Sequence, residues 1–333
     1  MAPYKVAAVQ ASPVFLEREA TLDKACRLIA EAGHNGARLI VLPESFVPCY
    51  PDWVWALPPG RASLSKELYG RLVANAVDVP GPATEQLGKA ARAASAYLVV
   101  GVTERNQEAS GASLYNTLVF FDDAGRLIGK HRKLMPTRAE RLVWAQGDGS
   151  TLKVYDTPLG KLGALICWEN YMPLARYAMY AWGTQVYLAP TWDRGQTWTA
   201  TLQHIAKEGR WYVIGCCTAL RRDEIPESLG LQPFYASDNE WVNVGDSAIV
   251  SPLGNFIAGP VRLREETLYA ELDIQETADA KWMFDAAGHY ARPDVFQLQV
   301  NRRANPIIDE RPLHTPEAID QSKERQGGAG AAQ

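Results

Sequence analysis

Residues 162–182 read LGALICWENYMPLARYAMYAW, and this stretch decides which class of fold the chain can adopt. It opens with a short apolar run, Leu162–Ile166, which has the length and composition of a buried strand. From about Tyr171 to Trp182 the apolar residues recur at helical spacing instead. A strand that leads directly into a helix predicts a layered α/β domain, with Cys167 at the turn between the two.

The same alternation of short apolar runs and amphipathic stretches extends along most of the chain. Short runs rich in β-branched residues predict strands, and longer stretches with helical spacing predict helices. The turn Asp122–Gly125 predicts a hairpin between two of the strands. We expect further strands at 4–10, 37–43, 97–104, 114–121, 126–133, 152–155, 186–189, 211–217, 247–251 and 267–272, and further helices at 17–34, 82–96 and 197–209.

The organisation into domains follows from where the composition changes. No strong linker interrupts the chain before residue 275, so a single domain is expected over residues 4–275. A more polar C-terminal extension, residues 276–333, follows it. Residues 315–333 are predicted to be disordered, because the extension ends in the low-complexity run KERQGGAGAAQ.

Composition excludes several classes of function. The 34 Lys and Arg residues against 38 Asp and Glu residues leave a net charge of −4, without the basic patch of a nucleic-acid-binding protein. No apolar run is long enough for a membrane span, and the N-terminus does not resemble a signal peptide. The five cysteines are odd in number and scattered, which favours a reducing cytoplasm over a disulfide framework.

Metal and cofactor chemistry find no matching motif. The five histidines form no His-x-x-x-His pair, and no Cys-x-x-Cys pair is present. The sequence also has no Gly-x-Ser-x-Gly elbow and no phosphate-binding Gly-x-x-x-x-Gly-Lys-Ser/Thr loop. We therefore expect neither a metal nor a cofactor.

Three reactive side chains end predicted strands, where the sites of α/β domains form. Glu44 follows the apolar run 37–43, and partial burial there would raise its pKa towards that of a general base. Lys133 ends the strand 126–133, on the opposite face from Lys130 and Arg132, where a cation could stabilise negative charge on a substrate. Taken alone, each residue has an ordinary alternative role. Glu44 could simply cap the element that follows it, and Lys133 could be an exposed basic residue on a strand edge.

Cys167 is the third candidate. The amide groups at the start of the predicted helix would favour its thiolate and could stabilise an oxyanion. The alternative is a small buried apolar residue, which is the commoner role of a free cysteine. The position alone leaves both open.

Together the three positions resemble the nitrilase superfamily of carbon–nitrogen hydrolases. The resemblance lies in Leu42-Pro-Glu44, in 131–137 (HRKLMPT) and in 167–170 (CWEN), which match a Glu-Lys-Cys triad in chain order. Residues 140–149, 167–177 and 288–294 resemble the nitrilase branch in particular, and the similarity covers roughly residues 4–300.

This resemblance implies a four-layer α-β-β-α sandwich, with residues 4–275 as the carbon–nitrogen hydrolase domain. It also implies homodimers, packed through helices near the cysteine, that assemble into larger homo-oligomers or spirals. Glu140 resembles the family's second catalytic carboxylate, although from its position alone it would be an ordinary surface residue. Aromatic residues flank the motifs and are expected to contact substrate: Tyr50, Trp53, Trp168 and Trp192.

The expected reaction is the hydrolysis of an organic nitrile to a carboxylic acid and ammonia through a covalent thioimidate and thioester on Cys167. A cyanide-degrading enzyme or an aliphatic amidase with the same triad is the alternative. A non-catalytic scaffold is disfavoured, because Glu44, Lys133 and Cys167 are all present. The expected partner is a small-molecule nitrile, without nucleic acid or membrane.

Overall fold

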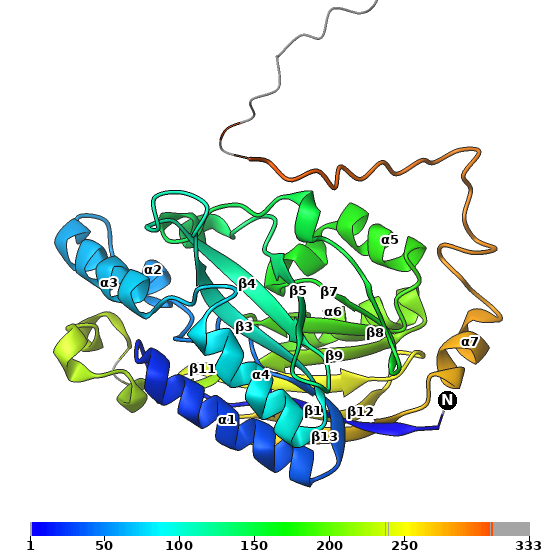
Figure 1. The fold of residues 1–333 in the computed structure, drawn as a ribbon, viewed down its shortest axis with the longest axis horizontal. Helices are drawn as coiled ribbons and strands as arrows, with labels where there is room; N and C mark the ends of the chain where they lie inside the picture. Colours follow the sequence, from blue (N-terminus) through cyan, green and yellow to red (C-terminus); the bar gives the residue numbers. More distant parts are fainter. Residues whose placement is uncertain (1, 237, 239, 307, 309–333) are drawn as a thin grey trace, which may run out of the picture.

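The computed structural model describes residues 2–236, 238, 240–306 and 308, which form two stacked β-sheets flanked by helices (Figure 1). The first sheet has the strand order β13 (Glu266–Leu272), β1 (Tyr4–Gln10), β2 (Ala37–Val41), β3 (Tyr97–Arg105), β4 (Leu114–Phe121) and β5 (Leu127–Arg132). The second has the order β10 (Ala219–Arg221), β11 (Trp241–Val250), β9 (Tyr212–Cys217), β8 (Val186–Thr191), β7 (Gly160–Ala164) and β6 (Tyr155–Thr157), with β12 (Phe256–Arg262) paired to β11.

The helices cover the outer faces of the two sheets. On the first sheet lie α1 (Arg18–His34) and α4 (Pro82–Ala94), which pack against each other. On the second lie α5 (Pro173–Ala181) and α6 (Gln196–Gly209). Two further helices, α2 (Trp53–Ala56) and α3 (Ala62–Asn75), extend to one side, and α7 (Gln275–Lys281) follows the last strand (Figure 1).

Alternation along the strands produces these layers. In β1, Val6 and Ala8 lie in the core between the sheets, while Ala7 and Val9 face α1 and α4. Successive side chains of a strand point to opposite faces, so a wholly apolar strand can be buried on both. The predicted four-layer α-β-β-α sandwich is therefore confirmed.

The predicted elements differ from the structure at several places, and β10, β12, α2 and α7 are among the elements that were not predicted. The helix expected from Tyr171 begins at Pro173, after a short 3-10 helix, η3 (Cys167–Tyr171), because Met172 is extended and proline suits a first helical position. Helix α3 was not predicted, since Leu68 and Leu72 are its only buried residues and give a weak periodic signal. Strand β11 begins at Trp241, well before the predicted residue 247.

The C-terminal region leaves the sandwich through α7, which begins at the predicted domain boundary and buries Thr277. Beyond α7 the chain returns along the surface, where the Arg302 guanidinium lies 5.1 Å from the ring centre of Trp182. The boundary at residue 275 stays a prediction, and residues 315–333, predicted to be disordered, lie outside the described residues. None of the described helices has the length and apolar character that crossing a bilayer requires.

Candidate active site

Glu44 reaches the interior because the chain leaves β2 in close contact with β3. The Gly101 amide donates a hydrogen bond to the Pro43 carbonyl at 3.1 Å. A Cβ atom at residue 101 would lie 2.2 Å from that oxygen and 2.4 Å from the backbone nitrogen of Ser45. Glycine is thus the residue that allows this approach, and it leaves the Glu44 side chain fully buried.

Lys133 is delivered from the neighbouring strand pair. Its backbone N–H donates to the Asn116 carbonyl at 2.8 Å and so extends the ladder between β4 and β5 by one residue. Its Nζ donates to Glu44 Oε1 at 2.8 Å and to Glu140 Oε2 at 2.7 Å. Burial lowers the pKa of Lys133, but Glu44, Cys167 and Glu140 outweigh burial, so its pKa lies above the usual value.

The predicted alternation along β5 is confirmed. Lys130 and Arg132 lie on the opposite face from Lys133 and both pair with Glu104, at 2.5 and 2.7 Å. The basic run is therefore divided between the two faces of one strand, with Glu104 as the partner on one face and Glu44 and Glu140 as the partners of Lys133 on the other.

Glu140 closes the set from the other side of Lys133. It lies in the 3-10 helix η1 (Arg138–Leu142), where its Oε2 also accepts the Thr137 amide at 2.7 Å. Its Oε1 accepts the Tyr50 hydroxyl at 2.7 Å. Three donors thus hold one buried carboxylate, which is not the ordinary surface glutamate that its position alone suggested.

The two oxygens of Glu44 differ in their surroundings. Oε1 accepts Lys133 Nζ and the Asn116 side-chain amide at 2.7 Å, whereas Oε2 is buried and has no partner among the described residues. Burial raises the pKa of Glu44, Lys133 opposes this, and the net result is a raised pKa. A carboxylate with one fixed and one free oxygen is oriented to accept a proton.

Cys167 is the first residue of η3, with φ of 50°, a left-handed conformation that non-glycine residues seldom adopt. The side chain is 4% exposed. Burial raises its pKa, Glu44 raises it further, and Lys133 with a hydrogen bond to Thr191 compensates only in part. The prediction that helix amides favour a resting thiolate is therefore wrong, because a five-residue 3-10 helix follows the cysteine and the thiol needs a base.

A further buried carboxylate, Glu169, joins the Lys133 and Cys167 segments. Its oxygens accept the backbone amides of Leu134 and Ile166, each at 2.6 Å, and Oε2 lies 3.0 Å from His131 Nε2. Burial opposes ionisation of Glu169, but His131 and the two amides outweigh it and lower its pKa. The sequence analysis did not single out Glu169, although a glutamate in the first turn of a helix was a usable signal.

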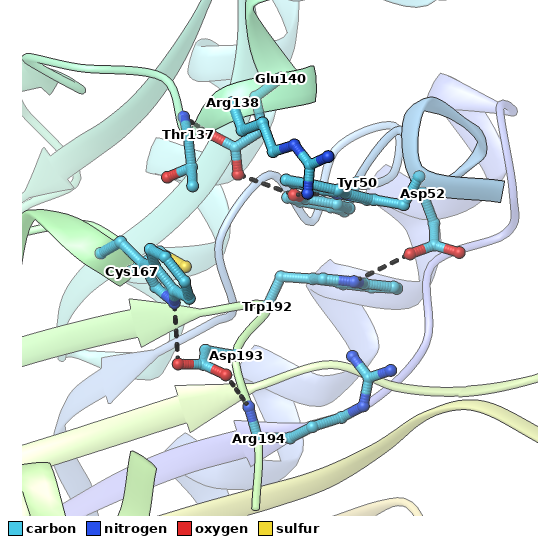
Figure 2. Close-up of a pocket in the computed structure, with 11 residues that line it drawn as sticks. Tyr50, Asp52, Thr137, Arg138, Glu140, Cys167, Trp192, Asp193 and Arg194 are labelled. Carbon is cyan, nitrogen blue, oxygen red and sulfur yellow. Dashed lines mark hydrogen bonds between the residues drawn. The ribbon is translucent and has the colours of Figure 1, made fainter. Parts of the chain in front are cut away.

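A cavity of about 460 Å³ opens above these groups and contains three of the four predicted aromatic contacts. Figure 2 shows Tyr50 stacked on Trp192 at one side of the cavity, with Cys167 across from them; the two rings lie 4.4 Å apart and nearly parallel. Trp168 also lines the cavity, but Trp53 does not, since it packs edge-on against Phe15. Trp55, which was not predicted, lines the cavity instead of Trp53. Its indole N–H donates to the Tyr50 hydroxyl at 3.0 Å.

Metal-binding side chains do not gather at this site. Within the described ranges, no group of three or more His, Cys, Asp or Glu residues has the arrangement to hold a metal ion. What the site offers is a thiol, a carboxylate with a free oxygen and a cation buried together, a combination suited to nucleophilic attack on an electrophilic carbon.

This fold and site belong to a known class: residues 5–281 match the carbon–nitrogen hydrolase family, and the chain is a member of it. The fold is also that of Nit3 from Saccharomyces cerevisiae, a member of branch 10 of the nitrilase superfamily. That solved structure has a TM-score of 0.64 and 23% sequence identity, over 86% of this chain and 96% of the other.

Two relatives of known designation are much more similar in sequence. A bifunctional nitrilase/nitrile hydratase, NIT4B of Nicotiana tabacum, is 46% identical over 89% of this chain and 85% of its own length. An aliphatic nitrilase of Sinorhizobium fredii is 45% identical over 94% of this chain and 97% of its own.

Proposed function

We propose that this chain is a nitrilase, which hydrolyses an organic nitrile to the carboxylic acid and ammonia. The observation that carries the proposal is the unpartnered Oε2 of Glu44 in a buried cluster with the Cys167 thiol and Lys133. The names of the relatives support nitriles over amides, so the amidase alternative is not favoured. Glu44 is the proposed general base, Cys167 the nucleophile, and Lys133 the cation that stabilises developing charge.

In the first half-reaction, Glu44 takes the proton from Cys167 and the sulfur attacks the nitrile carbon. One π bond of the nitrile breaks, and the nitrogen takes the proton held by Glu44 to give a thioimidate. Lys133 has three N–H donors and uses two on Glu44 and Glu140, so the third can stabilise the charge on nitrogen. The backbone N–H of Trp168, in the first turn of η3, is a second donor.

In the second half-reaction, Glu44 takes a proton from water while the oxygen adds to the thioimidate carbon. The proton passes to nitrogen, the proton of the new hydroxyl group follows it through Glu44, ammonia leaves, and a thioester remains on Cys167. A second water molecule then releases the carboxylic acid and restores the thiol. Glu140 holds Lys133 in place throughout, because it accepts from that ammonium, from Thr137 and from Tyr50.

The test is to incubate the purified protein with a panel of aliphatic and aromatic nitriles and their matching amides, and to quantify acid and ammonia. We expect both products from nitriles, and we expect Cys167→Ala to reduce turnover to background while its thermal unfolding still shows a folded protein. Release from amides only would favour the amidase alternative. Turnover by folded Cys167→Ala would overturn the proposed nucleophile.

A second product deserves measurement, because one relative is named as both a nitrilase and a nitrile hydratase. After water adds to the thioimidate, the tetrahedral carbon bears both nitrogen and sulfur. Loss of ammonia leads to the acid, whereas loss of the thiolate releases the amide. The proportion of amide in the product mixture reports how well the site protonates the departing nitrogen.

Assembly into homodimers and larger homo-oligomers is part of the proposal. An exposed apolar group beside the site supports it: Trp168 is 51% exposed, Tyr171 43%, Met172 36% and Leu174 68%. Clusters of exposed apolar side chains mark association surfaces in many proteins. We further propose that the protein acts in the cytoplasm, since five free cysteines, four of them buried, suit a reducing compartment.

A further inference from the structure

Two arginine side chains line the cavity and are not used by the proposed chemistry. Figure 2 shows Arg138 on the Tyr50 side of the aromatic stack and Arg194 on the Trp192 side. Both are exposed to solvent at the cavity. Within the described part of the chain, neither guanidinium group donates a hydrogen bond or forms an ion pair, so each offers five N–H donors.

The carboxylates of the same cavity are already occupied. Asp52 accepts the Trp192 indole N–H at 3.0 Å, and Asp193 accepts the Trp168 indole N–H and the Arg194 backbone N–H, each at 2.8 Å. Each of these carboxylates therefore holds in place one tryptophan that lines the cavity. The charge of Arg194 acts on Asp52, but among the described residues the two side chains form no hydrogen bond or ion pair with each other.

The lining thus has unused donors and few unused acceptors. A ligand that complements it must bring acceptors, and a carboxylate matches the planar fork of a guanidinium group best. The backbone conformation of Arg138 also supports a functional role for this residue. Arg138 is the first residue of η1, after Thr137, and its φ of 42° lies in the left-handed region.

We propose that the preferred substrate is a nitrile that carries a carboxylate, bound in the cavity that Arg138 and Arg194 line, with its cyano group directed to Cys167. The proposal rests on the nitrilase function above and adds the charge of the substrate to it. Arg138 and Arg194 act as binding residues for the end of the substrate remote from the reacting carbon, and they take no part in bond making.

The experiment compares three small nitriles of similar shape: 3-cyanopropanoate, its uncharged isostere 4-oxopentanenitrile, and the cationic 4-aminobutanenitrile. Ammonia release gives kcat and KM for wild type, Arg138→Gln, Arg194→Gln and the double variant. Arg27→Gln is the matched control, an exposed arginine of α1 outside the cavity. Thermal unfolding of each variant verifies that it is folded.

We expect wild type to favour the carboxylate over the isostere in kcat/KM by about tenfold or more, the equivalent of about 1.4 kcal/mol. Each arginine variant should raise KM for the carboxylate by about tenfold and change the isostere by less than about twofold. The double variant should lose the preference, and Arg27→Gln should keep it.

Three results would overturn the proposal: equal or better use of the isostere, a preference for the ammonium compound, or an equal loss for all three nitriles in the arginine variants. Failure of the nitrilase function itself gives a different result, which is no ammonia from any nitrile. In that case binding is measured directly, by the quenching of tryptophan fluorescence when succinate or 4-oxopentanoate is added to Cys167→Ala. Equal affinity for the dianion and the monoanion, with no effect of the arginine variants, would then reject the arginine site.

Discussion

At the scale of single residues, the site is a buried set of charges whose members depend on one another. Lys133 is 1% exposed and lies between two carboxylates. Removing one partner of such a group leaves an uncompensated buried charge, at a cost of about 3–5 kcal/mol. Variants of Glu44, Lys133 or Glu140 therefore combine losses of activity and of stability, whereas Cys167→Ala removes only a neutral thiol.

Asp52 gives a prediction about pH. Burial raises its pKa, Arg194 and the Trp192 hydrogen bond oppose burial, and the net effect raises the pKa of Asp52 to about 6. The folded protein thus binds this proton more tightly than the unfolded chain, so Asp52 lowers stability as the pH rises from about 4 to about 6, and the loss is complete above that range.

Asp52→Asn keeps an acceptor for Trp192 but does not titrate. Relative to wild type, the free energy of unfolding of the variant should increase by roughly 2–3 kcal/mol between pH 4 and pH 7.5. Urea unfolding of both proteins at the two pH values measures this. A difference between variant and wild type that stays constant with pH would contradict it.

At the scale of elements, the ends of strands place the site, and this is why much of it could be predicted. Glu44 follows β2, Lys133 follows β5 and Cys167 follows the β7 segment, so each is recognisable as a reactive residue after an apolar run. Asn116 lies inside β4, where a buried amide among apolar residues gives no indication of which distant carboxylate it will meet.

Trp53 and Trp55 show where sequence reasoning reaches its limit. Both belong to α2, a helix of four residues, and residues two positions apart in a helix point to different sides. Trp53 faces the interior against Phe15, and Trp55 faces the cavity. A helix of four residues is too short to give a periodic signal in the sequence. The sequence therefore could not indicate which of the two tryptophans faces the cavity.

The contact between β3 and the chain after β2 gives a prediction at this scale. Gly101→Ala would place a methyl group against the backbone of Pro43 and Ser45, which cannot move without displacing Glu44. We expect a loss of about 1–3 kcal/mol in stability and a fall in kcat of at least about a hundredfold. Thermal unfolding and nitrile turnover measure the two effects.

Gly70→Ala is the control for that substitution. Gly70 lies within α3, and a Cβ atom there meets nothing within 4 Å. Alanine should stabilise the helix by up to about 1 kcal/mol and leave turnover unchanged. If Gly101→Ala behaved like Gly70→Ala, the close approach would not be what positions Glu44.

At the scale of the whole molecule, the family resemblance correctly predicted the four-layer sandwich, and the alternation of side chains in β1 explains it physically. Assembly is a different matter, because contacts between chains depend on surfaces that no periodicity within one chain identifies. The exposed apolar group of Trp168, Tyr171, Met172 and Leu174 is the surface on which the proposal of homo-oligomers depends.

Leu174→Glu tests that surface. A charge in the centre of an apolar contact is desolvated on association, so the variant should sediment as a smaller species than wild type. Leu253→Glu is the matched control, since Leu253 is 57% exposed and lies between β11 and β12. Identical sedimentation of wild type and Leu174→Glu would show that the molecules associate elsewhere or not at all.

Lys133, Glu44, Glu140 and the neutral Cys167 thiol together carry one negative charge when the first three are ionised. Transfer of the Cys167 proton to Glu44 moves a charge from carboxylate to sulfur without changing that total, so no ion enters or leaves the buried site during attack. Dissolved salt screens interactions at the surface far more than those in the interior. The bond-making step is thereby insulated from ionic strength, and the influence of salt is confined to the exposed arginines at the cavity, where a charged substrate would first be captured.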